Sequence, residues 1–552
     1  MVVLPDEGLL EAASLWALLV ALVLSVYVPL RLRTDRRPLA RLRARLLLGV
    51  PWGTAIVVAA LLVVYYVVQG AGNLGQPVVV GFRSWSYSYP LGMVFGPFSH
   101  SSDGHITGNL VSTVAFAPIA EYVWSHYPTR RGSHSFGSWP TNPFVRVAAF
   151  VGAVFVVGLA TSFLIPGALI GFSGVVFAFG GFALVTRPVV GVVALVAERV
   201  VRLTYFTLDN PVLTARGRTQ FVTPYWADVA VQGHALGLLV GMLVGLLVAR
   251  RREEWPGVGR VWGAVLLFAT TKSLWAVYWY LGGTEYVLFR GAGLALVFAL
   301  AGLVAVSFAP GDRTLVSRID LSRREAAAGL LVAGVLAMGL TAVPYNTVSV
   351  APGPEAGAGV EVQDYTVTYA EDVPDRYIGA VDVPLFRDAF VVNTSGVVVT
   401  SDRRDAWEVV VPAQRLKVRG RVTVPVGRVG WRETVAVNRT TWSVIDGPET
   451  YKVYIQPPDG QRRQVYTAEP AVVPAVINDS RIAIRPADTG YEVTVGRNDT
   501  LVGTAPVPGE GGNVTVADIR FNRTGNRLRA IHDGTRVPIA EFELQVRRDR
   551  GS

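Results

Sequence analysis

The chain has 552 residues, of which 51% are hydrophobic and only 17% are charged, a composition that excludes a wholly soluble protein and predicts that about half of the chain lies in a membrane. Its net charge of +10 comes from residues 1–350, where Arg in short loops between apolar segments is typical of membrane orientation and argues against nucleic-acid binding. Cysteine is absent, which excludes disulfides, thiolate metal sites and a cysteine nucleophile.

Apolar runs long enough to cross a hydrocarbon core of about 30 Å recur from Leu9 to about Val343. The segment from Arg31 to Arg45 contains seven Arg, the densest basic cluster of the chain, so it is expected in the cytoplasm and the N-terminus outside. Later Arg-rich loops then fall on the cytoplasmic side as well. The pattern predicts a polytopic α-helical membrane protein with ten spans: 9–30, 46–69, 105–125, 144–165, 171–187, 188–204, 229–249, 258–281, 286–308 and 325–344.

The C-terminal residues 360–552 alternate apolar and polar side chains in short runs separated by Gly, Pro, Asn and Asp. This spacing predicts one or two all-β, sandwich-like domains, reached through a linker at 346–359. The charge count places this β region outside the cytoplasm. Six N-x-Ser/Thr sequons agree with that side if they are glycosylated, although unmodified triplets remain the alternative. The possible glycosylation sites are Asn393, Asn438, Asn478, Asn498, Asn513 and Asn522.

Polar residues that can carry chemistry gather at the outer ends of three predicted spans. His100, His105 and Asn109 surround the start of one span, and His105 and Asn109 share a helical face because they are four residues apart. Ionisable groups at such depth usually mark a site. Interhelical hydrogen bonding is the structural alternative for these side chains.

Two further segments enter the membrane from the same side. Ser173 lies in Gly171-Phe172-Ser173-Gly174, where the small flanking residues expose its hydroxyl. His234 begins a helix whose glycines recur every four residues through Gly237, so that a neighbouring helix can approach its backbone. A Ser hydroxyl becomes a good nucleophile when an adjacent base such as His accepts its proton. We therefore expect Ser173, His234, His105 and Asn109 at similar depth in one site.

In these motifs the chain resembles the rhomboid intramembrane serine proteases. The resemblance rests on His100, His105 and Asn109 at their spacing, on Gly-x-Ser-Gly at 171–174, and on His234 followed by Gly237. It implies a six-helix core over 46–250, a Ser173–His234 catalytic dyad, oxyanion stabilisation by His105 and Asn109, and a supporting role for His100. Outside this core, the expected parts of the chain are an extra helix and basic loop at 1–45, three additional helices at 251–345, the linker at 346–359 and the β region at 360–552.

The chain departs from the family pattern at three places. One is Gly233, which stands where the family often has Ala before the catalytic His. Phe177 stands where the family often has a Tyr that stacks on the catalytic His, which keeps the stacking and loses the hydroxyl. The loop before His100 lacks the usual Trp-Arg pair and carries Arg83 and Trp85 in a different place, so the resemblance does not imply that this loop docks into lipid. No carboxylate is placed as a third catalytic member, and neither a metal nor a cofactor is expected.

These features predict an endopeptidase that cleaves transmembrane protein substrates near the outer membrane face, in a multi-pass cell-membrane protein. The alternative is a catalytically silent rhomboid-like protein that binds membrane clients. Under either function the β region would recruit or screen those proteins. Lys272, expected in the middle of the 258–281 span, is left outside the site, because a lone Lys in a span can face a partner helix or reach the interface.

Overall fold

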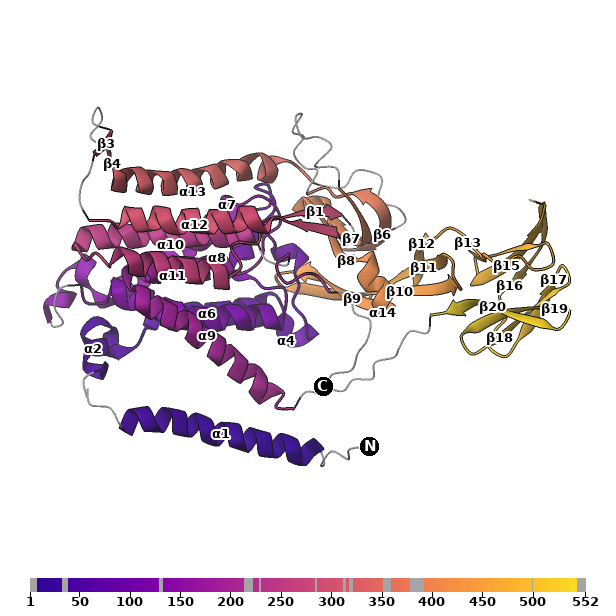
Figure 1. The fold of residues 1–552 in the computed structure, drawn as a ribbon, viewed down its shortest axis with the longest axis horizontal. Coiled ribbons are helices and arrows are strands. Elements are labelled where there is room, and N and C mark those ends of the chain that lie inside the picture. Colours follow the sequence, from indigo (N-terminus) through magenta and orange to yellow (C-terminus); the bar gives the residue numbers. More distant parts are fainter. Residues whose placement is uncertain are drawn as a thin grey trace.

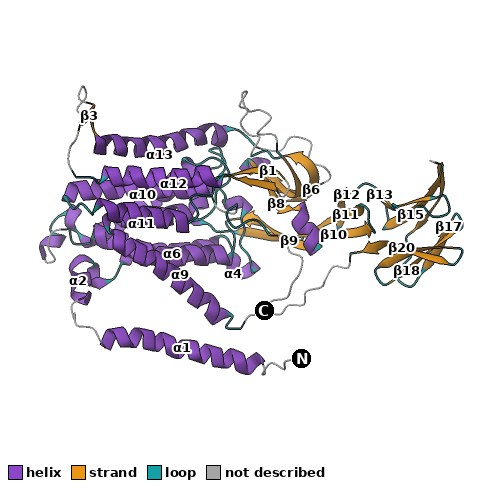
Figure 2. Cartoon of the chain, viewed as in Figure 1, coloured by secondary structure: helices purple, strands orange, loops and turns teal. Residues whose placement is uncertain are grey.

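The computed structural model describes residues 7–31, 38–128, 133–212, 222–227, 230–282, 285–310, 314–316, 321–350, 359–377, 392–498 and 500–543. A helical bundle occupies one end of the molecule and a β region the other (Figure 1, Figure 2). The helices are α1 (Glu7–Arg31), α2 (Pro38–Arg45), α3 (Trp52–Val63), α4 (Ala71–Leu74), α5 (Pro90–Phe95), α6 (Asp103–Trp124), α7 (Pro143–Phe163), α8 (Ser173–Thr186), α9 (Pro188–Asp209), α10 (Val231–Arg252), α11 (Val258–Thr271), α12 (Arg290–Ser307), α13 (Arg323–Thr347) and α14 (Ala413–Arg419).

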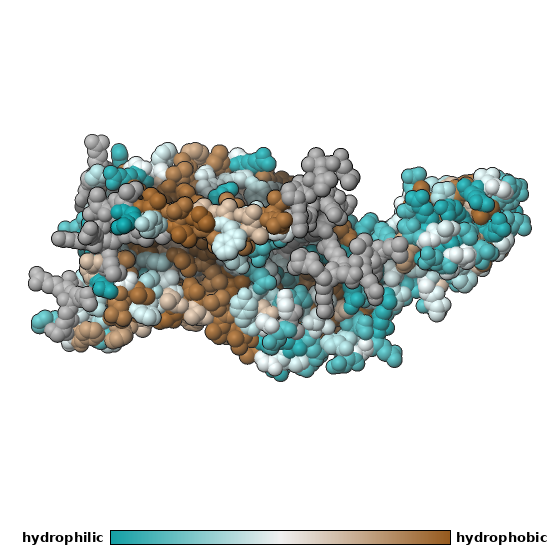
Figure 3. Space-filling view, turned by 90° about the horizontal axis from the view of Figure 1, so that it is seen from below, coloured by the Kyte–Doolittle hydropathy of each residue, from teal (hydrophilic) through white to brown (hydrophobic). Residues whose placement is uncertain are grey.

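A helix stands at each of the ten predicted spans. Five of them, α1, α7, α10, α12 and α13, are long and apolar enough to cross a membrane by length and composition alone. Apolar side chains such as Val193, Leu296 and Leu340 point outward, and brown, hydrophobic surface covers much of the bundle while the β region is mostly teal (Figure 3). An outward apolar surface of this kind suits contact with hydrocarbon, because helices satisfy their backbone hydrogen bonds internally.

One predicted span ends early, and this expectation was wrong. The helix predicted over 258–281 stops at Thr271, and Ser273 has a left-handed backbone with φ of 58°. The following aromatic residues form a hairpin of β1 (Tyr278–Gly282) and β2 (Glu285–Leu288) instead, because aromatic side chains favour strands. Lys272 is consequently at the end of α11 and not in its middle.

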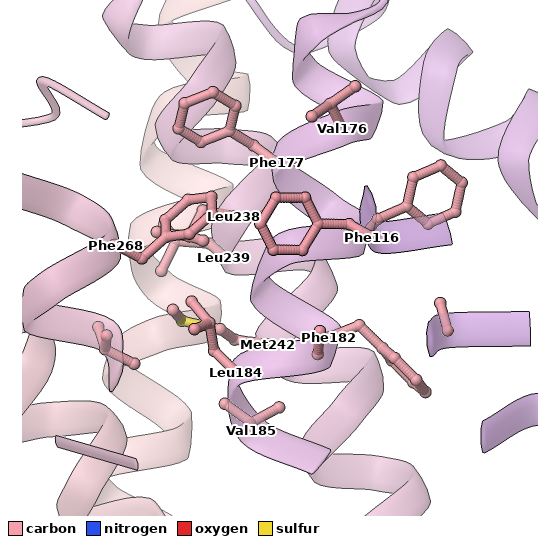
Figure 4. Close-up of a cluster of buried hydrophobic side chains, with 14 of the residues drawn as sticks. Phe116, Val176, Phe177, Phe182, Leu184, Val185, Leu238, Leu239, Met242 and Phe268 are labelled. Atoms are coloured by element: carbon pink, nitrogen blue, oxygen red, sulfur yellow. The ribbon is translucent and has the colours of Figure 1, made fainter. Parts of the chain in front are cut away.

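Helix α8 forms the centre of the bundle. All its residues from Gly174 to Thr186 are buried, which is why its sequence is apolar on every side. Its side chains Phe177 and Phe182 lie close to Phe116 of α6, Phe268 of α11 and Met242 of α10 (Figure 4). The residues around Ser173 are thus held by packing from several helices.

The β region contains two hydrophobic cores. The first lies between the sheet β5–β8 and strands β9–β11, and the second lies between the sheet β13–β16 and strands β17–β20. Strand β10 is long enough to pair with β9 along its first half and with β20 at its end. The strands are β5 (Val360–Val362), β6 (Tyr365–Pro374), β7 (Asn393–Ser401), β8 (Ala406–Pro412), β9 (Arg421–Arg428), β10 (Trp431–Val444), β11 (Glu449–Gln456), β12 (Arg463–Thr467), β13 (Ala471–Val472), β14 (Arg481–Pro486), β15 (Tyr491–Arg497), β16 (Thr500–Pro506), β17 (Asn513–Val516), β18 (Ile519–Thr524), β19 (Arg527–His532) and β20 (Thr535–Phe542), while the short β3 (Thr314–Val316) and β4 (Leu321–Ser322) precede α13.

Candidate active site

Ser173 is the first residue of α8. The chain reaches it through Gly171, whose N–H donates to the Gly96 carbonyl at 2.9 Å. Gly171 has φ of +125°, a conformation that L side chains rarely adopt, and an added Cβ would lie 2.6 Å from the His105 ring. Glycine is therefore required at this position for His105 to approach the backbone beside Ser173.

His234 lies in the first turn of α10 and stacks flat on Phe177. The ring centroids are 4.1 Å apart and the rings are inclined by 10°. Phe177 is four residues after Ser173 in α8, so both side chains project from the same face of that helix. The stacking therefore holds the imidazole along the face of α8 that carries the Ser173 hydroxyl.

Gly237 brings the two helices together one turn below His234. An added Cβ at Gly237 would lie 1.9 Å from the Gly174 carbonyl oxygen. The backbones of α8 and α10 are thus in direct contact directly after Ser173, as glycine at four-residue spacing permits. Any larger side chain at Gly237 would separate the two residues of the predicted dyad.

His105 and Asn109 both lie close to Gly171, because an added Cβ there would be 2.6 Å from the His105 ring and 3.8 Å from Asn109 Nδ2. The N–H and hydroxyl of Ser101 are 3.5 and 3.0 Å from His105 Nδ1, and the N–H can only donate, so Nδ1 accepts and we assign the proton to Nε2. Asn109 is 6% exposed, and its Nδ2 finds no hydrogen-bond partner among the described residues. The Asn109 amide is consequently an unpaired donor, among the described residues, close to the backbone that leads into Ser173.

His100 is buried next to His105. Its ring is fully buried, and it meets the His105 ring edge to face at a centroid distance of 5.1 Å. Gln69 fixes its backbone, because its side chain accepts from the His100 N–H at 2.8 Å and donates to the His100 carbonyl at 2.9 Å. The sequence did not single out Gln69, since nothing in its spacing from His100 indicates the contact.

The two carboxylates nearest in sequence to the histidines do not complete a triad in the described structure. Asp103 accepts a hydrogen bond from the Tyr65 hydroxyl at 2.9 Å. Asp228 lies outside the described residues. His234 Nδ1 is buried without a hydrogen-bond partner in the part of the chain that the structure describes.

A polar cluster that the sequence did not predict lies between α6, α9 and α11. Lys272 Nζ is 2.6 Å from both carboxylate oxygens of Glu198, and Ser112 donates to the same carboxylate at 2.6 Å. The Glu198 side chain is 6% exposed. The cluster explains how α9 can carry Glu198 among apolar neighbours, because a buried charge is tolerated when it is paired and hydrogen-bonded.

Comparison with known families decides what kind of domain holds these residues. Residues 87–251, from the loop before α5 to the end of α10, match the model of the Rhomboid domain. The chain carries a rhomboid domain. The resemblance predicted from the sequence is confirmed, and the matched segment of the rhomboid domain includes all nine predicted site residues outside the β region. No curated protein and no solved structure is significantly similar to the chain.

The loop that precedes the rhomboid domain's His100 contacts the β region. The Trp85 indole is 2% exposed, and its N–H donates to the Arg404 carbonyl at 3.1 Å. Arg83 pairs with Glu408 at 3.1 Å. The side chains of Arg83 and Trp85 are therefore both bound by the β region.

The predicted glycosylation sites fall on strands and turns of the β region. Asn393, Asn438, Asn513 and Asn522 lie on strands, while Asn478 and Asn498 lie in turns with left-handed backbones. The Asn393 amide donates to Asp372 and the Asn522 amide to the Gly512 carbonyl. A glycan at either of these two positions would leave the amide nitrogen with one N–H for that hydrogen bond.

Proposed function

We propose that the rhomboid domain is an intramembrane serine endopeptidase that cleaves transmembrane protein substrates with a Ser173–His234 dyad. The observation that carries the proposal is the flat stacking of His234 on Phe177, one helical turn from Ser173. An imidazole on the face of α8 that presents the hydroxyl supports the role of His234 as the base that accepts the Ser173 proton. The backbone contact at Gly237 holds the two helices at that separation.

In this mechanism His234 accepts the Ser173 proton while Oγ attacks the scissile carbonyl. The same imidazolium then donates its proton to the leaving amine, and a water molecule activated by His234 releases the acyl group. The oxyanion is stabilised by His105 Nε2–H, Asn109 Nδ2–H and the Ser173 N–H. Each such donor contributes about 3 to 4 kcal/mol to transition-state binding in a site that excludes water. The unpaired, buried Asn109 amide supports this role, because a native structure rarely leaves such a donor without a ligand.

The proposed topology places the site at the outer membrane face. The N-terminus and the β region are extracytoplasmic, and the Arg-rich loops, including Arg250 to Arg252 at the end of α10, are cytoplasmic. His234 lies in the first turn of α10, at the opposite end from Arg250 to Arg252, and Ser173 is the first residue of α8. Substrate helices would then be cut close to their outer ends.

The test is cleavage of a single-span reporter by the protein reconstituted in liposomes, with Ser173→Ala and His234→Ala as variants. We expect cleavage by the wild type and none by either variant. Reporter that binds to all three forms and is cut by none would instead favour the silent client-binding function. Cleavage that persists in Ser173→Ala would overturn the assignment of the nucleophile.

A further inference from the structure

Part of the loop before α6 completes the first hydrophobic core of the β region. Val80, Trp85 and Tyr89 are buried in one cluster with strand residues such as Val367 and Val399. The loop and the sheet β5–β8 therefore share a core, and separating them would expose the Trp85 and Tyr89 rings to water.

Arg404 holds this loop at two points. Its guanidinium donates to the Tyr89 hydroxyl at 2.7 Å and pairs with Asp364 at 2.9 Å, while its carbonyl accepts from the Trp85 indole. The Arg404 side chain is 5% exposed. The next residue, Asp405, accepts from the Ser88 hydroxyl at 3.2 Å. A buried, charge-assisted contact of this kind gives the loop one defined position.

The loop in turn holds the segment that leads into α8. Ser84, between two residues bound by the β region, forms an antiparallel bridge with Leu169, with N–H to carbonyl distances of 2.9 and 3.0 Å. The Ser84 hydroxyl adds a hydrogen bond to the Leu169 carbonyl at 3.2 Å. Gly171 then donates to Gly96, farther along the same loop. A continuous set of contacts thus runs from Arg404 to the residues directly before Ser173.

A second set of contacts connects the same sheet with the segment before α10. Tyr280 of the β1–β2 hairpin hydrogen-bonds Thr394 of β7, and the Tyr278 hydroxyl donates to the Ala227 carbonyl at 2.7 Å. The Trp226 and Tyr278 rings meet at a centroid distance of 5.6 Å. Ala227, seven residues before His234, is therefore also in contact with an element that is bound by the β region.

We propose that the sheet β5–β8 is a clasp that positions both catalytic segments, with Arg404 as its central positioning residue. The inference rests on the proposed protease function and deepens it. It replaces the expectation that the whole β region serves to recruit or screen substrates: the first core belongs to the catalytic machinery. A shift of reacting groups by about 1 Å can lower a rate by about 100-fold. Separation of the loop from the sheet β5–β8 should therefore lower the catalytic rate.

The experiment compares Arg404→Gln and Arg404→Lys with Arg403→Gln in the full chain reconstituted in liposomes. Arg403 is the exposed neighbour of Arg404 and serves as the matched control. Two rates are measured: cleavage of the single-span reporter, separated into kcat and KM, and acylation of Ser173 by a small p-nitrophenyl ester, which releases p-nitrophenolate. The small probe needs no recruitment, so its rate reports the state of the nucleophile alone.

We expect Arg404→Gln to lower kcat and the acylation rate by the same factor, about 10- to 100-fold, with KM little changed. Arg404→Lys should fall between this variant and the wild type, because it keeps the charge and loses the two-pronged contact, and Arg403→Gln should match the wild type. If Arg404→Gln does not fold, Trp85→Phe keeps an aromatic ring in the core, removes the indole N–H together with part of the ring volume, and should lower both rates by a smaller factor.

Undocking of the loop is measured independently with Ser86→Cys. The chain has no cysteine, and Ser86 is 1% exposed, so maleimide labelling of this thiol should accelerate when Arg404→Gln is added. Faster labelling in a variant whose kcat and acylation rate equal those of the wild type would overturn the positioning role of the sheet. A raised KM with an unchanged acylation rate would also overturn it and would indicate that the sheet recruits substrates. A wild-type chain that neither cleaves nor is acylated would overturn the protease function itself, and the positioning role with it.

Discussion

At the scale of single residues, Phe177 is the side chain that orients the proposed base. Removing its ring in Phe177→Ala should lower kcat about 2- to 10-fold, because a stacked aromatic pair is worth roughly 0.5 to 1.5 kcal/mol beyond its burial. Phe177→Tyr keeps the ring and should retain most of the rate. Phe116→Ala is the control for lost packing, since Phe116 is equally large and buried and packs on Phe268. If kcat of Phe177→Ala equals that of the wild type, stacking on Phe177 does not contribute to catalysis.

Gly237 gives a second test at this scale. Gly237→Ala places a Cβ where the Gly174 carbonyl stands and should force α8 and α10 apart, with a loss of about 1 to 3 kcal/mol in stability and at least a tenfold loss of reporter cleavage. Gly302→Ala on α12 is the matched control, because no atom lies within 4 Å of its added Cβ. Comparable thermal stability and activity in the two variants would contradict close packing at Gly237.

At the scale of elements, local sequence patterns predicted most of the helices, whereas contacts between residues far apart in the sequence could not be predicted. Apolar runs predicted the helices because each run carries its own length and polarity, and Ser173 and His105 stood in short motifs. The end of α11 was missed because a continuous apolar run does not distinguish a helix from the aromatic strand β1. The pairing of Glu198 with Lys272, 74 residues apart, depends on how three helices pack and has no sign in the spacing.

The Glu198–Lys272 pair makes an element-scale prediction about α9 and α11. Lys272→Met leaves the Glu198 carboxylate buried beside Ser112 without its cation and should lower the free energy of unfolding by about 3 to 5 kcal/mol. The double variant Glu198→Gln with Lys272→Met removes both charges and should recover much of that loss. Thermal unfolding in detergent measures both. A double variant as unstable as Lys272→Met alone would mean that packing, and not the unpaired charge, accounts for the loss.

At the scale of the whole molecule, the two cores of the β region stand in different relations to the bundle. The first core contains Trp85 and Tyr89 of the bundle's own loop, whereas the second is built from the end of β10 and from β13 to β20. Strand β10 joins them as one continuous element. Damage to the first core should therefore reach the active site, and damage to the second should stay within the β region.

A matched pair of substitutions tests this division. Ile455 of the first core and Ile482 of the second are both fully buried, so Ile455→Ala and Ile482→Ala should each destabilise their own core by about 2 to 5 kcal/mol. Ile455→Ala should lower the temperature at which reporter cleavage is lost, while Ile482→Ala should leave that temperature unchanged and make only the second core sensitive to protease. Limited proteolysis during heating follows each core separately. Equal loss of cleavage in both variants would show that the β region acts on the site as one unit, because β10 would then transmit unfolding of the second core to the first.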